Sequence, residues 1–220
     1  MDYEWNFTPV LAAWPVLLTG LWNTCQLAIV AIAGSLLCGL VFGVLRTVRG
    51  PLGWIANIYV EVFRNTPVLV LLLLIFYLVP IYLGVKNNGF LVAALTLSLY
   101  KGAYVAEIYR SGIKSVERGQ WEAAKALGLP YLQQLRYIVL PQAVRRMIPA
   151  FTNRVIETFK LTAIASLVVY PELMYQTKVI AQTEFRPIES YTILALFFAA
   201  VVLPMSYLSS SLEKRLKAAE

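Results

Sequence analysis

Long apolar runs constrain the fold of this 220-residue chain more than any other feature of its sequence. The first run, residues 21–45, has no charged side chain before Arg46. Four more follow at residues 66–83, 90–112, 148–170 and 191–212. A helix needs about 20 residues to cross the hydrocarbon core of a bilayer, and each run is near that length. We therefore expect an all-α, polytopic membrane protein with five transmembrane helices, forming a single domain over residues 1–220.

Composition agrees with this expectation and limits the chemistry. The chain is 59% apolar with a mean hydropathy of +0.67, against about 45–50% apolar residues in soluble domains. It contains no histidine, which argues against histidine-based zinc sites and histidine general bases. Its carboxylates are scattered along the sequence. Its two cysteines, Cys25 and Cys38, are interpreted as small buried side chains in an apolar run. We expect no catalytic residues and no metal site, so the chain is not predicted to be an enzyme.

Basic residues predict the orientation, because cytoplasmic loops of membrane proteins are enriched in Lys and Arg. The stretches predicted to share one side carry Arg46, Arg49, Arg64, Lys114, Arg118, Lys125, Arg136, Arg145, Arg146, Lys214, Arg215 and Lys217. The opposite side has only Lys86, Lys178 and Arg186. The N-terminus is therefore expected outside and the C-terminus in the cytoplasm.

A polar loop, residues 113–147, separates the third and fourth runs and must stand in water beside the membrane. Good helix formers extend from Lys114 to Leu127, and Gly128 could end that helix in a left-handed cap before Pro130. A second helix is predicted over residues 131–139, making a compact knob. The residues alone equally allow an amphipathic helix pair lying flat on the membrane. One pattern marks the loop: Glu122, Ala123, Ala124, Gly128, Ile138, Leu140 and Pro141.

This pattern, E-A-A, three residues, Gly, nine residues, Ile, one residue, Leu-Pro, resembles the cytoplasmic coupling loop of permease subunits in bacterial ABC importers. The stretches G-A-Y-V-A-E-I-Y-R-S-G-I-K from Gly102 and Y-V-E-V-F-R-N-T-P from Tyr59 are similar to the subfamily that imports polar amino acids, with relatives among histidine and glutamate/aspartate systems. The resemblance extends from about residue 17 to 207. It departs in the fourth run, where many relatives have Lys, then Asp or Asn, then Thr-Ser-Leu, and this chain has Leu161 after Lys160.

The resemblance implies an inner-membrane, multi-pass permease that moves a polar amino acid by alternating access. The substrate could be glutamate or aspartate, a basic amino acid or a related compound. It implies a second permease subunit in a homo- or heterodimer, two cytoplasmic ATPase subunits, and an extracytoplasmic solute-binding protein. No G-x-x-x-x-G-K-[ST] sequence is present, so ATP and Mg are expected on the partner ATPase and no cofactor on this chain. The chain is also expected to contact the lipid bilayer, and it is not expected to bind nucleic acid. In this interpretation the seven loop positions couple the permease to the ATPase.

Charged residues within the predicted spans are candidates for the substrate pathway, since ionisable groups at membrane depth are costly. Glu61/Arg64, Glu107/Arg110 and Glu157/Lys160 share an i,i+3 spacing that brings side chains together on a helix. The first two pairs are interpreted as structural. The third either binds the charged groups of an amino acid or forms an ion pair at a subunit seam. The predicted pathway residues are Asn153, Glu157, Lys160, Thr162 and Lys101.

Two other functions remain to be weighed. A self-sufficient secondary carrier would usually have more spans and internal repeats, and neither is evident in the sequence. A membrane enzyme would need clustered carboxylates or histidine. The permease is therefore the preferred hypothesis, and the secondary carrier is the alternative.

Overall fold

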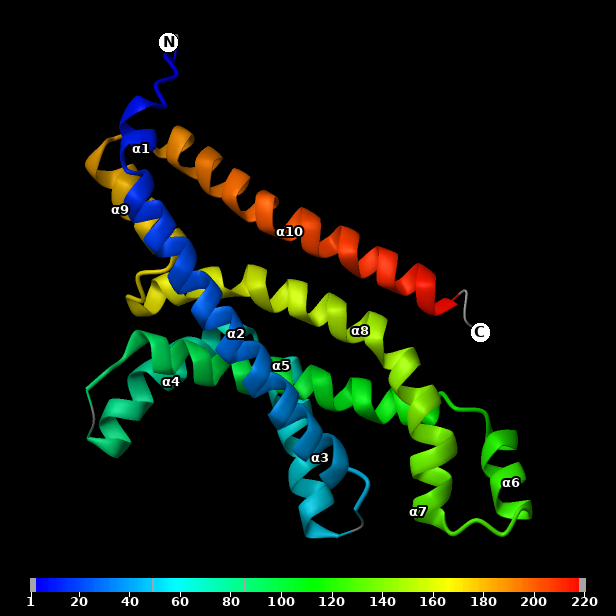
Figure 1. Cartoon of the computed structure of the whole chain (residues 1–220). Coiled ribbons are helices and arrows are strands. Elements are labelled where there is room, and N and C mark those ends of the chain that lie inside the picture. The colour runs from blue at the N-terminus through cyan, green and yellow to red at the C-terminus, as the bar shows by residue number, and fades with distance from the viewer. Residues whose placement is uncertain (1–2, 49, 85, 218–220) are drawn as a thin grey trace.

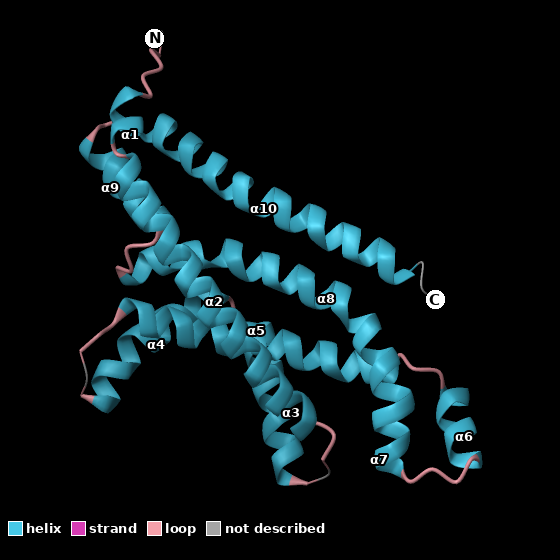
Figure 2. Cartoon of the chain, viewed as in Figure 1, coloured by secondary structure: helices cyan, strands magenta, loops and turns pink. Residues whose placement is uncertain are grey.

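The computed structural model describes residues 3–48, 50–84 and 86–217. Within these ranges the chain consists of helices and connecting loops, without strands (Figure 2). This confirms the predicted all-α fold class. In chain order the elements are α1 (Thr8–Ala12), α2 (Trp14–Leu45), α3 (Pro51–Asn65), α4 (Val68–Leu83), α5 (Gly89–Lys114), α6 (Arg118–Ala126), α7 (Tyr131–Gln133), a π-helix η1 (Gln134–Val139), α8 (Leu140–Leu161), a 3₁₀-helix η2 (Thr162–Val168), α9 (Leu173–Thr183) and α10 (Pro187–Lys217).

The α2–α5 pair forms the centre of the fold. Small residues on α2 let the backbones of the two helices approach closely, as is common where membrane helices pack. A Cβ atom added at Gly39 would overlap the side chain of Val105, and one at Gly34 would overlap Ser98. Leu27 and Ala31 of α2 are fully buried in the same seam with Leu97 of α5. The apolar run of α2 thus contains a packing stripe.

The outward faces of the long helices are apolar. Ile29, Leu37, Ile81, Leu203 and Leu208 are each at least 66% exposed. Soluble monomers rarely expose continuous apolar surface of this extent, whereas lipid-facing helices must do so. This pattern accounts for the high mean hydropathy despite a modest buried core.

The second predicted span, residues 66–83, corresponds to α4, and the sequence analysis missed the helix before it. α3 and α4 together meet the length and hydropathy requirement of a span, but they are bent by 111° at residues 66–67. Thr66 is extended, with ψ 133°, because the residue before a proline is driven out of the helical region by Pro67. The segment that begins at Pro51 is therefore two helices, α3 and α4, with a sharp bend between them.

Helix lengths support three further predicted spans. α2, α5 and α10 are long and apolar enough to cross a membrane among the described residues. The fourth predicted span differs: α8 ends at Leu161, and the 3₁₀-helix η2 continues it to Val168. Arg154, Glu157 and Lys160 lower the hydropathy of α8, which is not among the helices long and apolar enough to cross a membrane. The count of five crossings stays a prediction.

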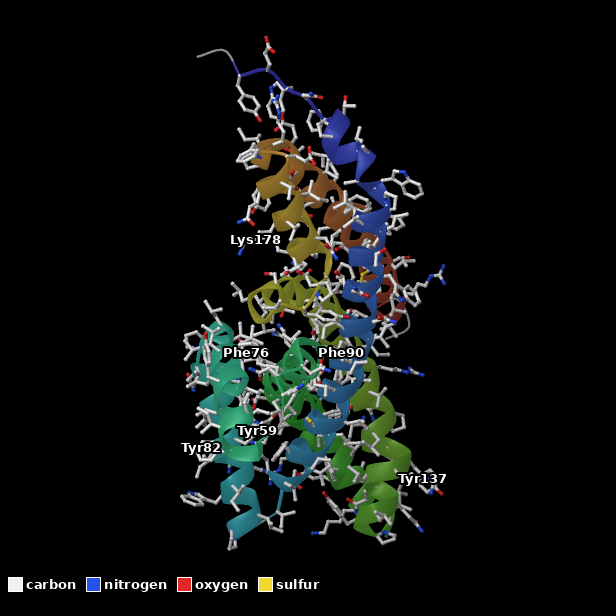
Figure 3. All side chains as sticks on the ribbon, turned by 90° about the vertical axis from the view of Figure 1, so that its left-hand side faces the viewer. Tyr59, Phe76, Tyr82, Phe90, Tyr137 and Lys178 are labelled. Carbon is white, nitrogen blue, oxygen red and sulfur yellow. The ribbon has the colours of Figure 1, made fainter. Side chains whose placement is uncertain are left out.

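Two ends of the molecule are distinguishable in Figure 1. α1, the α9–α10 turn and the C-terminal end of α4 lie toward the left, whereas α6, α7 and the C-terminal end of α10 lie toward the right. In Figure 3, which is viewed from the left-hand side of Figure 1, Lys178 of α9 lies in the upper half of the molecule and Tyr137 of η1 in the lower half. Arg49, one of the residues used to predict orientation, lies outside the described residues.

Candidate functional site: a polar hairpin and a charged pocket

Residues 118–139, called the polar hairpin from here on, form α6, a turn, α7 and η1. Gly128 adopts the left-handed conformation with φ +74°, as the sequence predicted. The N–H of Gly128 donates to Lys125 O over 3.0 Å, and the N–H of Leu129 donates to Ala124 O over 3.2 Å. These two bonds form a Schellman motif, which satisfies the last carbonyls of α6 and reverses the chain.

The base of the polar hairpin packs on the helices beside it. Val139 is fully buried in a cluster with Met147 of α8 and Ile108 of α5, against which Trp121 also packs. The Trp121 and Tyr131 rings stack with centroids 5.9 Å apart, joining the two arms of the hairpin. The two arms of the hairpin are thus packed together, and its base is packed on α5 and α8.

The prediction of one helix from Lys114 to Leu127 was wrong. α5 ends at Lys114, and α6 begins only at Arg118. Between them Val116 turns inward and is 4% exposed, while Arg146 donates a hydrogen bond to Ser115 O. Burial of Val116 and this hydrogen bond favour a break over a continued helix.

The second predicted helix, 131–139, is present but runs into α8 without interruption. Its last six residues form a π-helix that ends at Val139, two residues before Pro141. Proline lacks an N–H and its ring crowds the carbonyl four residues earlier, so a wider turn accommodates it within a continuous helix. Gln142 Nε2 donates to Ile138 O over 3.0 Å at this point.

The seven pattern positions fall in three places, on α6, at the turn, and where the polar hairpin joins α8. Glu122 and Ala123 are exposed on α6, and Ala124 is buried beneath them. Gly128 occupies the turn, while Ile138, Leu140 and Pro141 lie where η1 enters α8. Glu122 pairs with Arg118 over 2.9 Å, and both side chains are more than half exposed. The tip also exposes Leu127, Tyr131 and Leu132, at 77%, 66% and 74%. Charged groups beside exposed apolar side chains are suited to contact another protein.

A polar pocket of about 490 Å³ lies between α8 and α10. Its volume is within the range of about 300–1,000 Å³ typical of small-molecule sites. Three predicted pathway residues, Asn153, Glu157 and Lys160, line it. The sequence analysis missed its other polar lining residues, Arg154, Ser206, Ser209, Ser210 and Glu213. The i,i+3 spacing of Arg154 and Glu157, and the run Ser209-Ser210-Ser211 in an apolar segment, could have indicated them.

The predicted Glu157–Lys160 ion pair is not formed. Glu157 Oε2 instead accepts from Arg154 Nη1 over 2.6 Å and from Lys101 Nζ over 3.0 Å. Lys101 comes from α5, and its side chain is only 8% exposed. A sequence-local spacing cannot reveal a partner on another helix. Lys101 thus belongs to the pocket's charge cluster, although it does not line the cavity.

Thr162 lies apart from the pocket. It is fully buried, and its Oγ1 donates to Phe159 O over 2.7 Å within the same helical segment. Among the described residues its hydroxyl therefore serves the backbone at the α8–η2 junction, which gives no support to its predicted place on the pathway.

Of the other two ion pairs predicted from i,i+3 spacing, only one is formed. Glu107 and Arg110 pair as predicted, whereas Glu61 accepts from Asn65 and does not pair with Arg64. Arg46 Nη1 lies 2.7 Å from Glu107 Oε2, and Arg64 Nη1 lies 3.8 Å from the same oxygen. One carboxylate thus joins α2, α3 and α5 near the bend between α3 and α4.

Comparison with known proteins decides the family. Residues 35–218 match the model of the binding-protein-dependent transport system inner membrane component. The chain belongs to this family. The permease is 35% identical over 199 residues to the probable glutamine ABC transporter permease protein GlnM of Bacillus subtilis (strain 168), covering 90% of this chain and 92% of that protein. It is 33% identical over 222 residues to the glutamine transport system permease protein GlnP of Escherichia coli (strain K12), covering 99% of each.

Solved structures agree with the permease fold. The crystal structure of an amino acid ABC transporter with histidines matches with a TM-score of 0.92 at 33% identity, covering 97% of this chain and 100% of that one. An inward-facing MetNI methionine ABC transporter matches with a TM-score of 0.75 at 20% identity, a likeness of fold alone. The resemblance seen in the loop pattern is thereby confirmed at the level of the whole chain.

Proposed function

We propose that this chain is the permease subunit of an ATP-driven importer for a polar amino acid. The observation that carries the proposal is the likeness to a solved amino acid ABC transporter, with a TM-score of 0.92 over 97% of the chain. The relatives named for glutamine cover nearly its full length. The polar pocket between α8 and α10 supports the same function, since polar and charged groups at membrane depth mark substrate pathways.

The polar hairpin is proposed to couple the permease to a cytoplasmic ATPase. Its tip exposes Glu122 and Leu127, and its base packs on α5 and α8. ATP and Mg would be bound by the ATPase subunits, and closure of those subunits would pull the hairpin. Because the hairpin base packs on α5 and α8, its displacement would tilt helices beside the pocket. Alternating access would follow from this movement.

The proposed orientation places the N-terminus outside and the C-terminus in the cytoplasm. The polar hairpin and the end of α10 lie toward the same side of the molecule (Figure 1), and both carry the basic residues that favour the cytoplasm. An external binding protein would deliver solute from the opposite side. A second permease subunit, identical or paralogous, would complete the pathway in the inner membrane.

The experiment that tests this function is co-expression of the permease with candidate ATPase and binding-protein partners encoded beside it. A complex should purify, and its ATP hydrolysis should rise when binding protein loaded with a polar amino acid is added. Glu122→Lys should weaken the association with the ATPase, because it reverses a charge on the exposed tip. A matched control is Lys178→Glu, an exposed position on α9, which lies far from the polar hairpin (Figure 1). Equal recovery of ATPase with both variants would contradict the proposed docking site.

A further inference from the structure

The charges of the α8–α10 pocket constrain which amino acids it could accept. Three cations, Lys101, Arg154 and Lys160, surround or line the pocket, against two carboxylates, Glu157 and Glu213. Charge selectivity depends on which of these groups are already paired within the chain, because a paired group gives little net attraction to a ligand. Two of the three cations are paired with Glu157, and the third is not.

Two of the cations are already committed. Lys101 is held on Glu157 Oε2, and its side chain is 8% exposed, so it cannot turn toward a solute in the cavity. Arg154 pairs with the same oxygen, and its guanidinium carbon lies 5.1 Å from the centroid of the Tyr104 ring. A guanidinium held by a carboxylate and an aromatic face together is fixed in place.

The remaining cation is Lys160. It is exposed, lines the cavity, and makes no hydrogen bond or ion pair with any residue in the described ranges. Its ammonium group is therefore available to an anion entering the pocket.

The two carboxylates leave few oxygens available to bind a cationic group of a solute. Glu157 uses Oε2 for both cations, which leaves Oε1 as its only oxygen without a hydrogen bond from the described residues. Glu213 is engaged in an interaction of its own and is not a free carboxylate. Among the described residues the pocket therefore offers Glu157 Oε1 to one ammonium group, and its second carboxylate, Glu213, is already engaged.

We infer that Lys160 binds the α-carboxylate of the transported amino acid, that Glu157 Oε1 accepts its α-ammonium group, and that the pocket selects neutral polar or acidic amino acids over arginine and lysine. A cationic side chain would meet the unpaired Lys160, while Glu157 Oε1 holds the α-ammonium group and Glu213 is already engaged; like-charge contacts are costly. Asn153, which is exposed in the same cavity, can hydrogen-bond a neutral polar side chain. This inference rests on the proposed function, because it assumes that the solute is an amino acid.

The test measures solute binding to the permease itself, since a binding protein has its own selectivity. The complex of the permease with its own partner subunits is purified in detergent, and equilibrium dialysis measures labelled L-glutamine, L-glutamate, L-arginine and L-lysine without binding protein. We expect glutamine or glutamate to bind at least about tenfold more tightly than arginine and lysine. Equal or tighter binding of arginine or lysine would overturn the selectivity.

Variants then test the residue. Lys160→Gln should weaken glutamine or glutamate binding by about tenfold or more, and Lys160→Arg should restore most of it, because the positive charge is what acts. Lys178→Gln, an exposed lysine outside the pocket, is the matched control and should bind as the unaltered chain does. Unchanged binding by Lys160→Gln would refute the role of this residue, as would absence of binding by all four amino acids. The proposed function has a separate test, which is the stimulation of ATP hydrolysis by loaded binding protein, so failure of the binding experiment would not by itself contradict it.

Discussion

Lys101 Nζ lies 3.0 Å from Glu157 Oε2, so an ion pair joins the middle of α5 to α8. The lysine side chain is nearly buried and the glutamate side chain is 41% exposed, so the pair stands at the border between the packed helices and the pocket. Arg154 completes it from the same helix as Glu157. This cluster fixes the wall of the pocket to the central α2–α5 pair.

Removing the lysine should destabilise the fold. Lys101→Gln leaves Glu157 with Arg154 alone and puts an uncharged group in a buried position. Breaking a fully buried pair costs about 3–5 kcal/mol, and the partial exposure of Glu157 suggests a loss of about 1–3 kcal/mol here. Thermal unfolding of the detergent-solubilised permease measures the change. Lys178→Gln is the matched control, and an equal midpoint for both variants would show that the cross-helix pair contributes nothing.

Close packing of α2 on α5 predicts a second stability effect. Gly39→Ala places a methyl group against Val105, where a Cβ atom would overlap the side chain. Overpacking of this kind typically costs about 1–3 kcal/mol. Leu40→Ala, at the neighbouring 47% exposed position, removes only lipid-facing surface and should change the unfolding midpoint less. The reverse order of the two midpoints would contradict the packing argument.

The turn of the polar hairpin offers a matched pair of glycines. An added Cβ meets nothing within 4 Å at Gly128 or at Gly119, but only Gly128 has a positive φ, +74°. Gly128→Ala therefore strains the backbone by about 1–2 kcal/mol, and Gly119→Ala does not. We expect Gly128→Ala to lower amino-acid-stimulated ATP hydrolysis while the chain still inserts, because the tip of the hairpin is re-aimed. Full stimulation in Gly128→Ala would count against a coupling role for this turn.

The proposed orientation predicts which positions a membrane-impermeant thiol reagent reaches. In a background with Cys25→Ala and Cys38→Ala, Lys178→Cys should react in intact cells. Lys125→Cys on the polar hairpin should react only after the membrane is opened. The opposite pattern would place the polar hairpin outside and exclude contact with a cytoplasmic ATPase.

The sequence predicted those parts of the structure that depend on local chemistry. The apolar runs located α2, α4, α5 and α10, and Gly128 before Pro130 located the left-handed turn. In each case the neighbouring residues carry the determining property: hydropathy for the helices, and freedom to adopt positive φ for the turn.

Relationships between distant residues were predicted less well. The i,i+3 rule assigned Glu157 to Lys160, but Lys101, 56 positions earlier, and Arg154 hold it instead. The rule identifies which side chains can meet on one helix, and it has no information about a neighbouring helix. The bend at residues 66–67 was missed for a different reason: Pro67 marks a helix boundary, but only tertiary packing determines that α3 and α4 meet at 111°.

The measurement that tests the account most directly is amino-acid uptake by proteoliposomes containing the permease complex. With ATP on the hairpin side and binding protein loaded with labelled glutamine or glutamate on the other, uptake should require both ATP and the binding protein. Gly128→Ala should reduce uptake, and Gly119→Ala should not. Uptake that proceeds without the ATPase subunit, driven by an ion gradient alone, would contradict the account and identify the chain as a self-sufficient carrier.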